Sequence, residues 1–541
     1  MRTGLTVTAF LLSTVATSAA TFDSGAVVVL DSLLTDSAGT PVPVEVTNGT
    51  DLIITAGGAV TPVERSTAVR IEDTSTLTVE DGAVITSAPS MQERQSAGSG
   101  AVVTDQAKVT ITGGAITGGA GLVGDRFDEG GNGLSLLDEA DFIMSGGTIT
   151  GGESFGRFGD AGHGVRFELE DHSDIGVFLL SGGTITGGAA EDDPGDGIRG
   201  DLSDGRDIEV RFTGGTVVGG ASATDFGGSG ANFQNGDNMV FSGTDFFGGA
   251  SNGDGGGHGL ELDQTETTIT GGSFIGGKGQ EDGGDGLHSE AAEVTITGGV
   301  FMGGESEREV GGRAIFFEEV GALGNISGGT FTGGKGGDGA GAAIRVEDNA
   351  GVLITGGTFT GGEGGAAALE VFDSVFSNLV FVSGGTFIGS VDAEGDQREA
   401  VWVKDRSKME ISGGSFNATA SALSTLSISA DTAGTTPSII MEDESVLDLR
   451  GGTFGGHFEL SDSAQLNVYG QKLSFNNGLL TGVLQDQTSI SVHVTVSENA
   501  SVNLIPAPVP LPASLPLLVA GIGAVTLMRR RNSPAAHTAA A

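Results

Sequence analysis

The sequence predicts an all-β chain wound as a parallel β-helix, and two observations support this. The first is a recurring octapeptide, with the copies TGGAITGG at 112–119, SGGTITGG at 145–152 and 181–188, and TGGTFTGG at 355–362. Twelve copies between residues 113 and 451 have a mean spacing of about 31 residues, a period typical of stacked supersecondary units. The second is the alternation of apolar and polar residues on both sides of each glycine pair, which is the period of a strand.

Each repeat contains the elements of one coil. A strand such as 108–111 (KVTI) precedes the glycine pair, a short Thr-Ile-Thr or Thr-Phe-Thr strand follows it, and a second Gly-Gly and a Gly/Asp loop lead to a third strand such as 133–137. Three strands and three turns make one coil, and each coil lengthens the rod by one strand spacing, roughly 4.8 Å. We expect the glycines to form the corners between sheets, since Gly reaches positive φ without steric cost.

One apolar residue follows each glycine pair and should form an internal column. Its members are Ile116, Ile149, Ile185, Val217, Phe246, Phe274, Phe301, Phe331, Phe359, Phe387, Phe416 and Phe454. The alternative, a Gly-rich disordered linker, does not explain an apolar residue kept in register twelve times.

This pattern, over about 113–456, resembles the right-handed parallel β-helices of pectin-lyase-like shape, which occur in surface proteins and passenger domains. The resemblance implies the fold and leaves the chemistry open, because the same solenoid carries adhesins, lyases and inert stalks.

The amino-acid composition excludes some classes of binding partner. The chain has 25 Lys and Arg against 70 Asp and Glu, a formal charge of −45, which argues against binding nucleic acid or anionic lipid. It has no Cys, so stacked strands and apolar columns must hold the fold without disulfides.

The N-terminal part divides into two segments. Residues 1–20 have the form of a secretory signal peptide, with Arg2, an apolar stretch over 5–15 and small residues before a cleavage site near Ala19 or Ala20. A buried first strand or helix is the alternative. Residues 21–110 read as irregular strands that form an N-terminal cap and the first coils, before the regular repeats of 111–456.

The C-terminal part changes character twice. The glycine pairs stop after 456, and alternating strands over 457–505 predict a C-terminal β cap. Residues 506–514 are Pro-rich, 515–531 combine an apolar transmembrane segment with an arginine cluster, and 532–541 form a tail. Counted from 509 the apolar stretch has the length of a bilayer core, and the arginines should stay cytoplasmic.

This tail resembles the VPLPA-type C-terminal sorting signal, a relative of the PEP-CTERM tags of exosortase systems. The matching residues are Val509, Pro510, Leu511, Pro512, Ala513, Ser514, Arg529, Arg530 and Arg531. The resemblance implies processing by an exosortase-like membrane enzyme, followed by release or attachment at the cell surface, often in producers of extracellular polysaccharide. Residues 532–541 depart from the pattern, because such tags usually end at the basic cluster. A plain membrane anchor without processing is the alternative.

The sequence indicates no catalytic or cofactor site. No glycine motif has the strand–turn–helix context of a dinucleotide site, and GxxxxGK[ST] does not occur. Calcium is the one metal considered. Five aspartates in equivalent loops could coordinate it, but Asp also suits Gly-rich turns: Asp160, Asp196, Asp254, Asp285 and Asp338.

Three histidines in the same loop region are the other candidate for a site. His163 and His258 both lie in Gly-His-Gly in the equivalent loop, and His288 lies nearby in its own coil. We interpret all three as solvent-exposed turn residues, because His163 and His258 should be three coils apart. Lys and Arg are sparse and scattered, and the chain has one Trp, Trp402, and one Tyr, Tyr469.

We therefore expect an exported structural or adhesive β-helix of the cell surface or matrix. It would be held by the inner membrane before processing, and extracellular polysaccharide is a possible partner. The competing prediction is a polysaccharide lyase or hydrolase, which would need a cluster of carboxylates with Arg or Lys on one sheet face.

Overall fold

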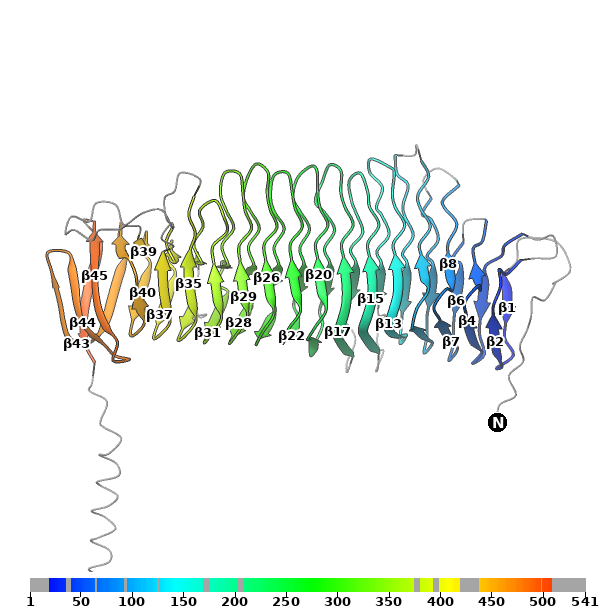
Figure 1. Ribbon diagram of the computed structural model, residues 1–541, viewed down its shortest axis with the longest axis horizontal. Coiled ribbons are helices and arrows are strands. Elements are labelled where there is room, and N and C mark those ends of the chain that lie inside the picture. The colour runs from blue at the N-terminus through cyan, green and yellow to red at the C-terminus, as the bar shows by residue number, and fades with distance from the viewer. Residues whose placement is uncertain are drawn as a thin grey trace, which may run out of the picture.

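The computed structural model describes residues 19–35, 40–63, 66–91, 95–123, 126–168, 176–202, 208–373, 380–392, 398–418, 437–497 and 499–507. They form an elongated parallel β-solenoid (Figure 1). This confirms the predicted all-β parallel solenoid. Within the described residues no helix has the length and apolar character needed to cross a bilayer. The predicted signal peptide, apart from its last two residues, and the transmembrane segment lie outside the described residues.

Each coil contributes one strand to sheet A and one or two to sheet B. The strands of sheet A are β1 (Ala20–Phe22), β3 (Val44–Val46), β6 (Val69–Ile71), β9 (Ala101–Val103), β12 (Leu134–Leu137), β14 (Val165–Glu168), β16 (Ile198–Asp201), β18 (Ala231–Gln234), β21 (Leu260–Asp263), β24 (Leu287–Glu290), β27 (Ile315–Glu318), β30 (Ile344–Val346), β33 (Leu369–Val371), β36 (Val401–Val403), β39 (Pro437–Met441), β42 (His457–Leu460) and β45 (Ser489–Val496). Neighbours in this order pair in parallel.

Sheet B holds the strands on both sides of the first glycine pair. Those before it, or at the equivalent place, are β2 (Val27–Leu30), β4 (Asp51–Ile54), β7 (Thr76–Val79), β10 (Lys108–Ile111), β19 (Met239–Phe241), β22 (Glu266–Ile269), β25 (Glu293–Ile296), β28 (Leu323–Ile326), β31 (Gly351–Ile354), β34 (Val380–Val382), β37 (Lys408–Ile411), β40 (Val446–Leu449), β43 (Gln465–Asn476) and β46 (Ser501–Pro506). Those after it are β5 (Ala59–Val60), β8 (Val84–Thr86), β11 (Ala115–Thr117), β20 (Asp245–Phe247), β23 (Ser273–Ile275), β26 (Val300–Met302), β29 (Thr330–Thr332), β32 (Thr358–Thr360), β35 (Thr386–Gly389), β38 (Ser415–Ala418) and β41 (Thr453–Phe454). In three coils the two strands are continuous, as β13 (Asp141–Thr150), β15 (Val177–Thr186) and β17 (Glu209–Val218).

The predicted apolar column lies inside the rod. Its residues from Ile116 to Phe416 are fully buried, and Phe454 packs partly buried against the same core. The rings of Phe274, Phe301 and Phe331 stack face to face, with centroids 4.7 and 4.9 Å apart. Parallel pairing places identical positions one rung apart, so one residue type per repeat builds a continuous stack.

The first glycine pair turns the chain as predicted, but within one sheet. Its second member has positive φ, for example +73° at Gly114 and +111° at Gly299. The strands on either side both belong to sheet B and run on without a break in β13, β15 and β17. The pair therefore bends sheet B, and the prediction that it separates two sheets was wrong.

The second glycine pair has a different role. Together with a further glycine pair before many sheet A strands, such as Gly256–Gly257 and Gly283–Gly284, it builds the arms that rise above the strands in Figure 1. Backbone packs directly on backbone in these arms. Gly277 donates to the Gly257 carbonyl at 2.7 Å, Gly284 to Gly277 at 2.9 Å and Gly304 to Gly284 at 2.7 Å. A Cβ added to Gly284 would lie 2.0 Å from the Gly257 oxygen. A side chain at these arm glycines would clash with backbone, and none of them has a positive φ. The sequence does not predict this role.

The last described coils close the rod with an antiparallel hairpin. The end of β43 pairs antiparallel with β44 (Leu479–Leu484), which pairs antiparallel with β45. Leu480, Leu484, Val492 and Val494 from these strands are buried in the core. This hairpin covers apolar surface that a further coil would otherwise cover.

Candidate functional site

The five aspartates considered for calcium do not form one row. Asp160, Asp254 and Asp338 are exposed in the tip loops of non-adjacent coils. Asp196 and Asp285 are buried where an arm meets sheet A. All five lie, as expected, in the loop between a sheet B strand and the next sheet A strand, but Asp196 and Asp285 stand two residues before their sheet A strand and the other three lie nearer the loop tip.

A polar side chain at this junction caps the next coil. His258 Nδ1 accepts the Asp285 N–H at 3.1 Å, and Asp285 Oδ1 accepts the Arg313 N–H at 2.7 Å. Three coils earlier, His163 Nδ1 accepts the Asp196 N–H at 2.9 Å. Buried backbone N–H groups just before a strand need a hydrogen-bond acceptor, and these side chains supply it. Their presence is therefore explained by the fold.

The histidines are therefore not the exposed turn residues that the sequence suggested. The side chains of His163, His258 and His288 are only 18%, 30% and 12% exposed. His258 and His288 come from adjacent coils, and their ring centroids are 4.6 Å apart. His163 is separate, and its Nδ1 lies 3.7 Å from the carboxylate of Asp196 in the next coil.

His288 is the centre of a cluster of acids. It projects outward from β24, with Nδ1 3.3 Å from Asp285 Oδ2. Its Nε2 lies 3.1 Å from Glu290 Oε1 and 3.6 Å from Glu318 Oε2. Arg313 lies 3.7 Å from the other oxygen of Asp285. Three carboxylates and two cationic groups thus share one outward patch of sheet A.

A row of aromatic and charged side chains continues from His288 along sheet A. Register places Glu261, His288, Phe316, Arg345 and Glu370 on successive strands β21, β24, β27, β30 and β33. His288 meets Phe316 edge-on at 5.1 Å, and the Arg345 guanidinium lies 5.8 Å from the Phe316 ring centre. Arg345 also lies 4.0 Å from Glu370. The row is a continuous polar and aromatic strip.

The environment moves the pKa values of this strip. Burial disfavours the charged form of His288, but its hydrogen bonds to Asp285 and Glu290 outweigh burial and raise its pKa to about 10. Burial also opposes ionisation of Asp285, yet Arg313 and His288 hold its pKa below the usual range. Burial raises the pKa of Glu370 to about 7 despite Arg345 nearby. The strip and the junction beside it thus combine an ionised carboxylate, Asp285, with a carboxyl that titrates near neutrality, Glu370.

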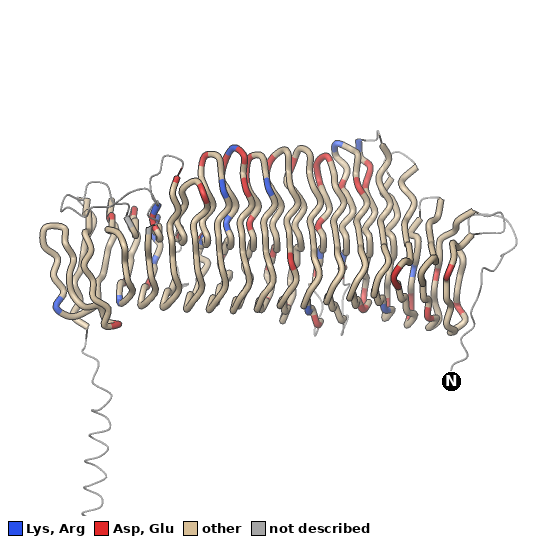
Figure 2. The backbone as a smooth tube through the Cα atoms, in the orientation of Figure 1, with Lys and Arg blue, Asp and Glu red and all other residues tan. Residues whose placement is uncertain are grey.

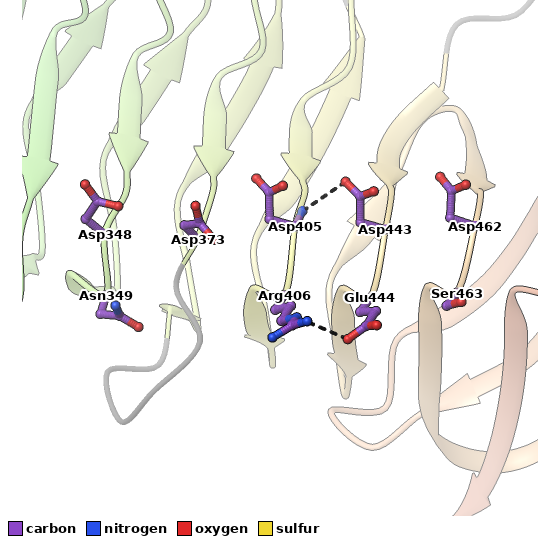
Figure 3. Close-up of a pocket in the computed structure, with 9 residues that line it drawn as sticks. All are labelled: Asp348, Asn349, Asp373, Asp405, Arg406, Asp443, Glu444, Asp462 and Ser463. Carbon is purple, nitrogen blue, oxygen red and sulfur yellow. Dashed lines mark hydrogen bonds and ion pairs between the residues drawn. The ribbon is translucent and has the colours of Figure 1, made fainter.

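A second acidic feature lies along the turn that follows sheet A. Asp348, Asp373, Asp405, Asp443 and Asp462 occupy one position in successive coils, all with positive φ between 48° and 61°. Figure 3 shows their carboxylates in a row beside the groove that they line. The Asp405 N–H donates to Asp443 Oδ2 at 3.4 Å. Asp tolerates the left-handed conformation and bonds nearby backbone, so this row is explained as turn chemistry.

The sequence analysis predicted neither the cluster around His288 nor the row of turn aspartates. A signal for the cluster was present in the sequence. Aligning the coils on the glycine before each sheet A strand places Gly259 over Gly286. That alignment sets Glu261 against His288 and His258 against Asp285. The sorting residues 509–514 and 529–531 lie outside the described residues, so the structure does not place them.

Comparisons with known proteins leave the function open. No protein-family model matches the chain, and no curated protein matches it. Two similar solved structures are tailspike protein 3 of bacteriophage CBA120, at 10% identity and a TM-score of 0.20, and the A-module of the Azotobacter vinelandii mannuronan C-5 epimerase AlgE6, at 12% and 0.19. The alignments cover 88% and 85% of this chain, and 58% and 91% of the other chains. The chain thus spans little more than half the length of the tailspike. Function must be argued from this chain's own residues.

Proposed function

We propose that this chain is an exported structural or adhesive rod of the cell surface or extracellular matrix. The observation that carries the proposal is the parallel pairing of coil on coil from β1 to β46, interrupted only by the antiparallel strand β44 among the described strands, in a solenoid built without disulfides. Its coils are right-handed in this proposal, as parallel crossovers almost always are. A body in which each unit contacts its neighbours suits a mechanical role.

The distribution of charge fits such a rod. Figure 2 shows acidic and basic residues both at the arm tips and among the strands below them. A chain with a net charge of −45 stays soluble and resists self-association outside the cell.

An adhesive surface is available at the arm tips. Phe127 and Phe158, from adjacent coils, are each 45% exposed and stack with ring centroids 5.7 Å apart. The guanidinium groups of Arg126 and Arg157 lie 5.3 and 5.5 Å from the Phe158 ring centre. Exposed aromatic faces beside donors suit extracellular polysaccharide, which is the partner we propose. Sedimentation with neutral and acidic glycans should show binding that a Phe127→Ala/Phe158→Ala variant loses.

Surface delivery in this proposal uses the C-terminal tag. An exosortase-like enzyme would cut near 509–514 after the apolar segment has held the chain in the inner membrane. C-terminal mass mapping of the native protein, with and without Pro512→Ala, tests this step. We expect the last roughly 30 residues to be lost only from the wild type. An intact C-terminus on exported wild-type protein would overturn the sorting role.

A polysaccharide-active enzyme is the second candidate, favoured by the strip on sheet A. A lyase or hydrolase needs carboxylates with different protonation states and a basic group on one face. Glu370 and Arg345 provide two of these types on the neighbouring strands β33 and β30, and Asp285 provides the third just before β24, two coils from Arg345. Turnover of acidic or neutral glycans that is lost in Glu370→Gln would establish the enzyme and displace the structural role. No turnover across both classes would leave the structural role standing.

A further inference from the structure

The imidazole of His288 and two carboxylates converge on one point outside sheet A. Glu290 comes from the same strand, β24, and Glu318 from the next strand, β27, where it pairs in register with Glu290. The His288 Nε2 atom lies 3.1 Å from Glu290 Oε1 and 3.6 Å from Glu318 Oε2. All three ligand atoms lie within 4.8 Å of one another. Ligand atoms about 2.0–2.2 Å from a single ion are separated by distances of this size.

The other ring nitrogen of His288 is held as in metal-binding histidines. Nδ1 lies 3.3 Å from Oδ2 of Asp285, whose side chain is 2% exposed. Asp285 is itself fixed, because its Oδ1 accepts the Arg313 backbone N–H. A buried carboxylate that accepts a hydrogen bond from one ring N–H orients the ring and leaves the other nitrogen to bind a metal. This contact does not depend on Glu290 or Glu318, and it points to the same ligand.

The site is open to solvent on its outer side. Side chains of Glu290 and Glu318 are 41% and 31% exposed, so an ion can enter and water can complete its coordination. The neighbouring group His258, Asp285 and His288 is less suitable, because His258 Nδ1 already accepts the Asp285 N–H. The strip also carries Glu261 and Asp263 on β21, which add negative charge beside the site.

We propose that His288 Nε2, Glu290 and Glu318 form a site for a divalent first-row transition metal, with Asp285 as the positioning residue behind His288. One nitrogen and two carboxylate oxygens suit Zn²⁺ or Mn²⁺, whereas Ca²⁺ prefers an all-oxygen shell of six to eight ligands. The metal would join two adjacent coils at the middle of the rod. This inference does not depend on the proposed function.

Calorimetry with Zn²⁺ on the full chain, without a polyhistidine tag, tests the site. A millimolar excess of Ca²⁺ should be present to occupy weak surface carboxylates. We expect one Zn²⁺ per chain, and binding at least about tenfold weaker in Glu290→Gln and in Glu318→Gln. The matched control is Glu168→Gln, which changes an exposed carboxylate in the equivalent place on β14, beside Arg166. That control should bind Zn²⁺ as the wild type does.

Asp285→Asn tests the positioning residue. Asparagine fits this junction, because Asn132 occupies the equivalent place and accepts the His163 N–H at 2.9 Å. Loss of a second-layer carboxylate typically lowers metal affinity about 10- to 100-fold, and the d–d spectrum of bound Co²⁺ should change with it. Circular dichroism would verify folding of each variant. Absence of Zn²⁺ binding by the folded wild type, or equal binding by all variants, would overturn the proposal.

Discussion

The lobe formed by the strands of sheets A and B and the glycine arms between those strands are both built from stacked coils. Side chains hold the lobe together, whereas backbone contacts hold the arms together. In the lobe, side chains fill the interior, as Phe301 does between Phe274 and Phe331. In the arms, backbone lies on backbone, as Gly277 does on Gly249. The comparison teaches that one residue type serves two purposes in one repeat. The first glycine pair supplies a backbone angle, and the second supplies the space left by an absent side chain.

Gly284→Ala in the arm should have the largest effect on stability. The new Cβ would lie 2.0 Å from a backbone oxygen that is fixed by its own coil, so whole coils must separate. We expect a loss of about 5 kcal/mol or more in the free energy of unfolding, measured by urea denaturation. Gly339→Ala is the control, because the nearest atom to its Cβ is 4.0 Å away. Equal effects of the two changes would contradict the account of the arm.

Phe301→Ala measures the side-chain packing of the lobe. The ring is fully buried in the stack, and its removal leaves a cavity that the neighbouring rings cannot fill. The expected loss is about 3–5 kcal/mol in the same denaturation experiment. Phe226→Ala removes a ring that is 56% exposed in a tip loop and should change stability by less than about 0.5 kcal/mol. Similar losses for both would mean that the column does not carry the core.

Glu370 makes the outer face of the lobe sensitive to pH. Its pKa is raised from 4.5 to about 7 in the folded chain, so the folded state binds the proton more tightly than the unfolded state does. Its contribution to stability is complete below pH 4.5 and is lost as pH rises to 7, about 3 kcal/mol at most. Glu370→Gln should remove this part of the pH dependence in melting experiments. A variant with an unchanged pH profile would show that Glu370 does not titrate in this range.

Asp443→Asn should have the smallest effect. Asp443 has a φ of 56°, and asparagine adopts that conformation and can still accept the Asp405 N–H. Repulsion from the carboxylates of neighbouring coils also raises the pKa of Asp405, after the larger effect of burial. We expect a change within about 0.5 kcal/mol, neutral or slightly stabilising, and no response of the melting temperature to a calcium chelator. A large loss that calcium reverses would instead make this groove a calcium site.

The contrast between lobe and arm also explains what the sequence could predict. The column from Ile116 to Phe454 repeats once per coil, so a period-two pattern beside Gly-Gly was sufficient to find it. The arm glycines could not be assigned, because a missing Cβ and a positive φ both select glycine. The sequence pattern predicts His258 and His288 as exposed turn residues. Their burial depends on the arm, whose packing the sequence pattern does not reveal.

Amide hydrogen exchange, resolved to single glycines, tests the central claim most directly. The arm amides of Gly277, Gly284 and Gly304 each donate to a carbonyl of a neighbouring arm segment. If the arms are packed as closely as the lobe, these amides should exchange as slowly as those of Phe274 and Phe301 in the strands. Exchange at the rate of an exposed loop, with only the strand amides protected, would contradict the account.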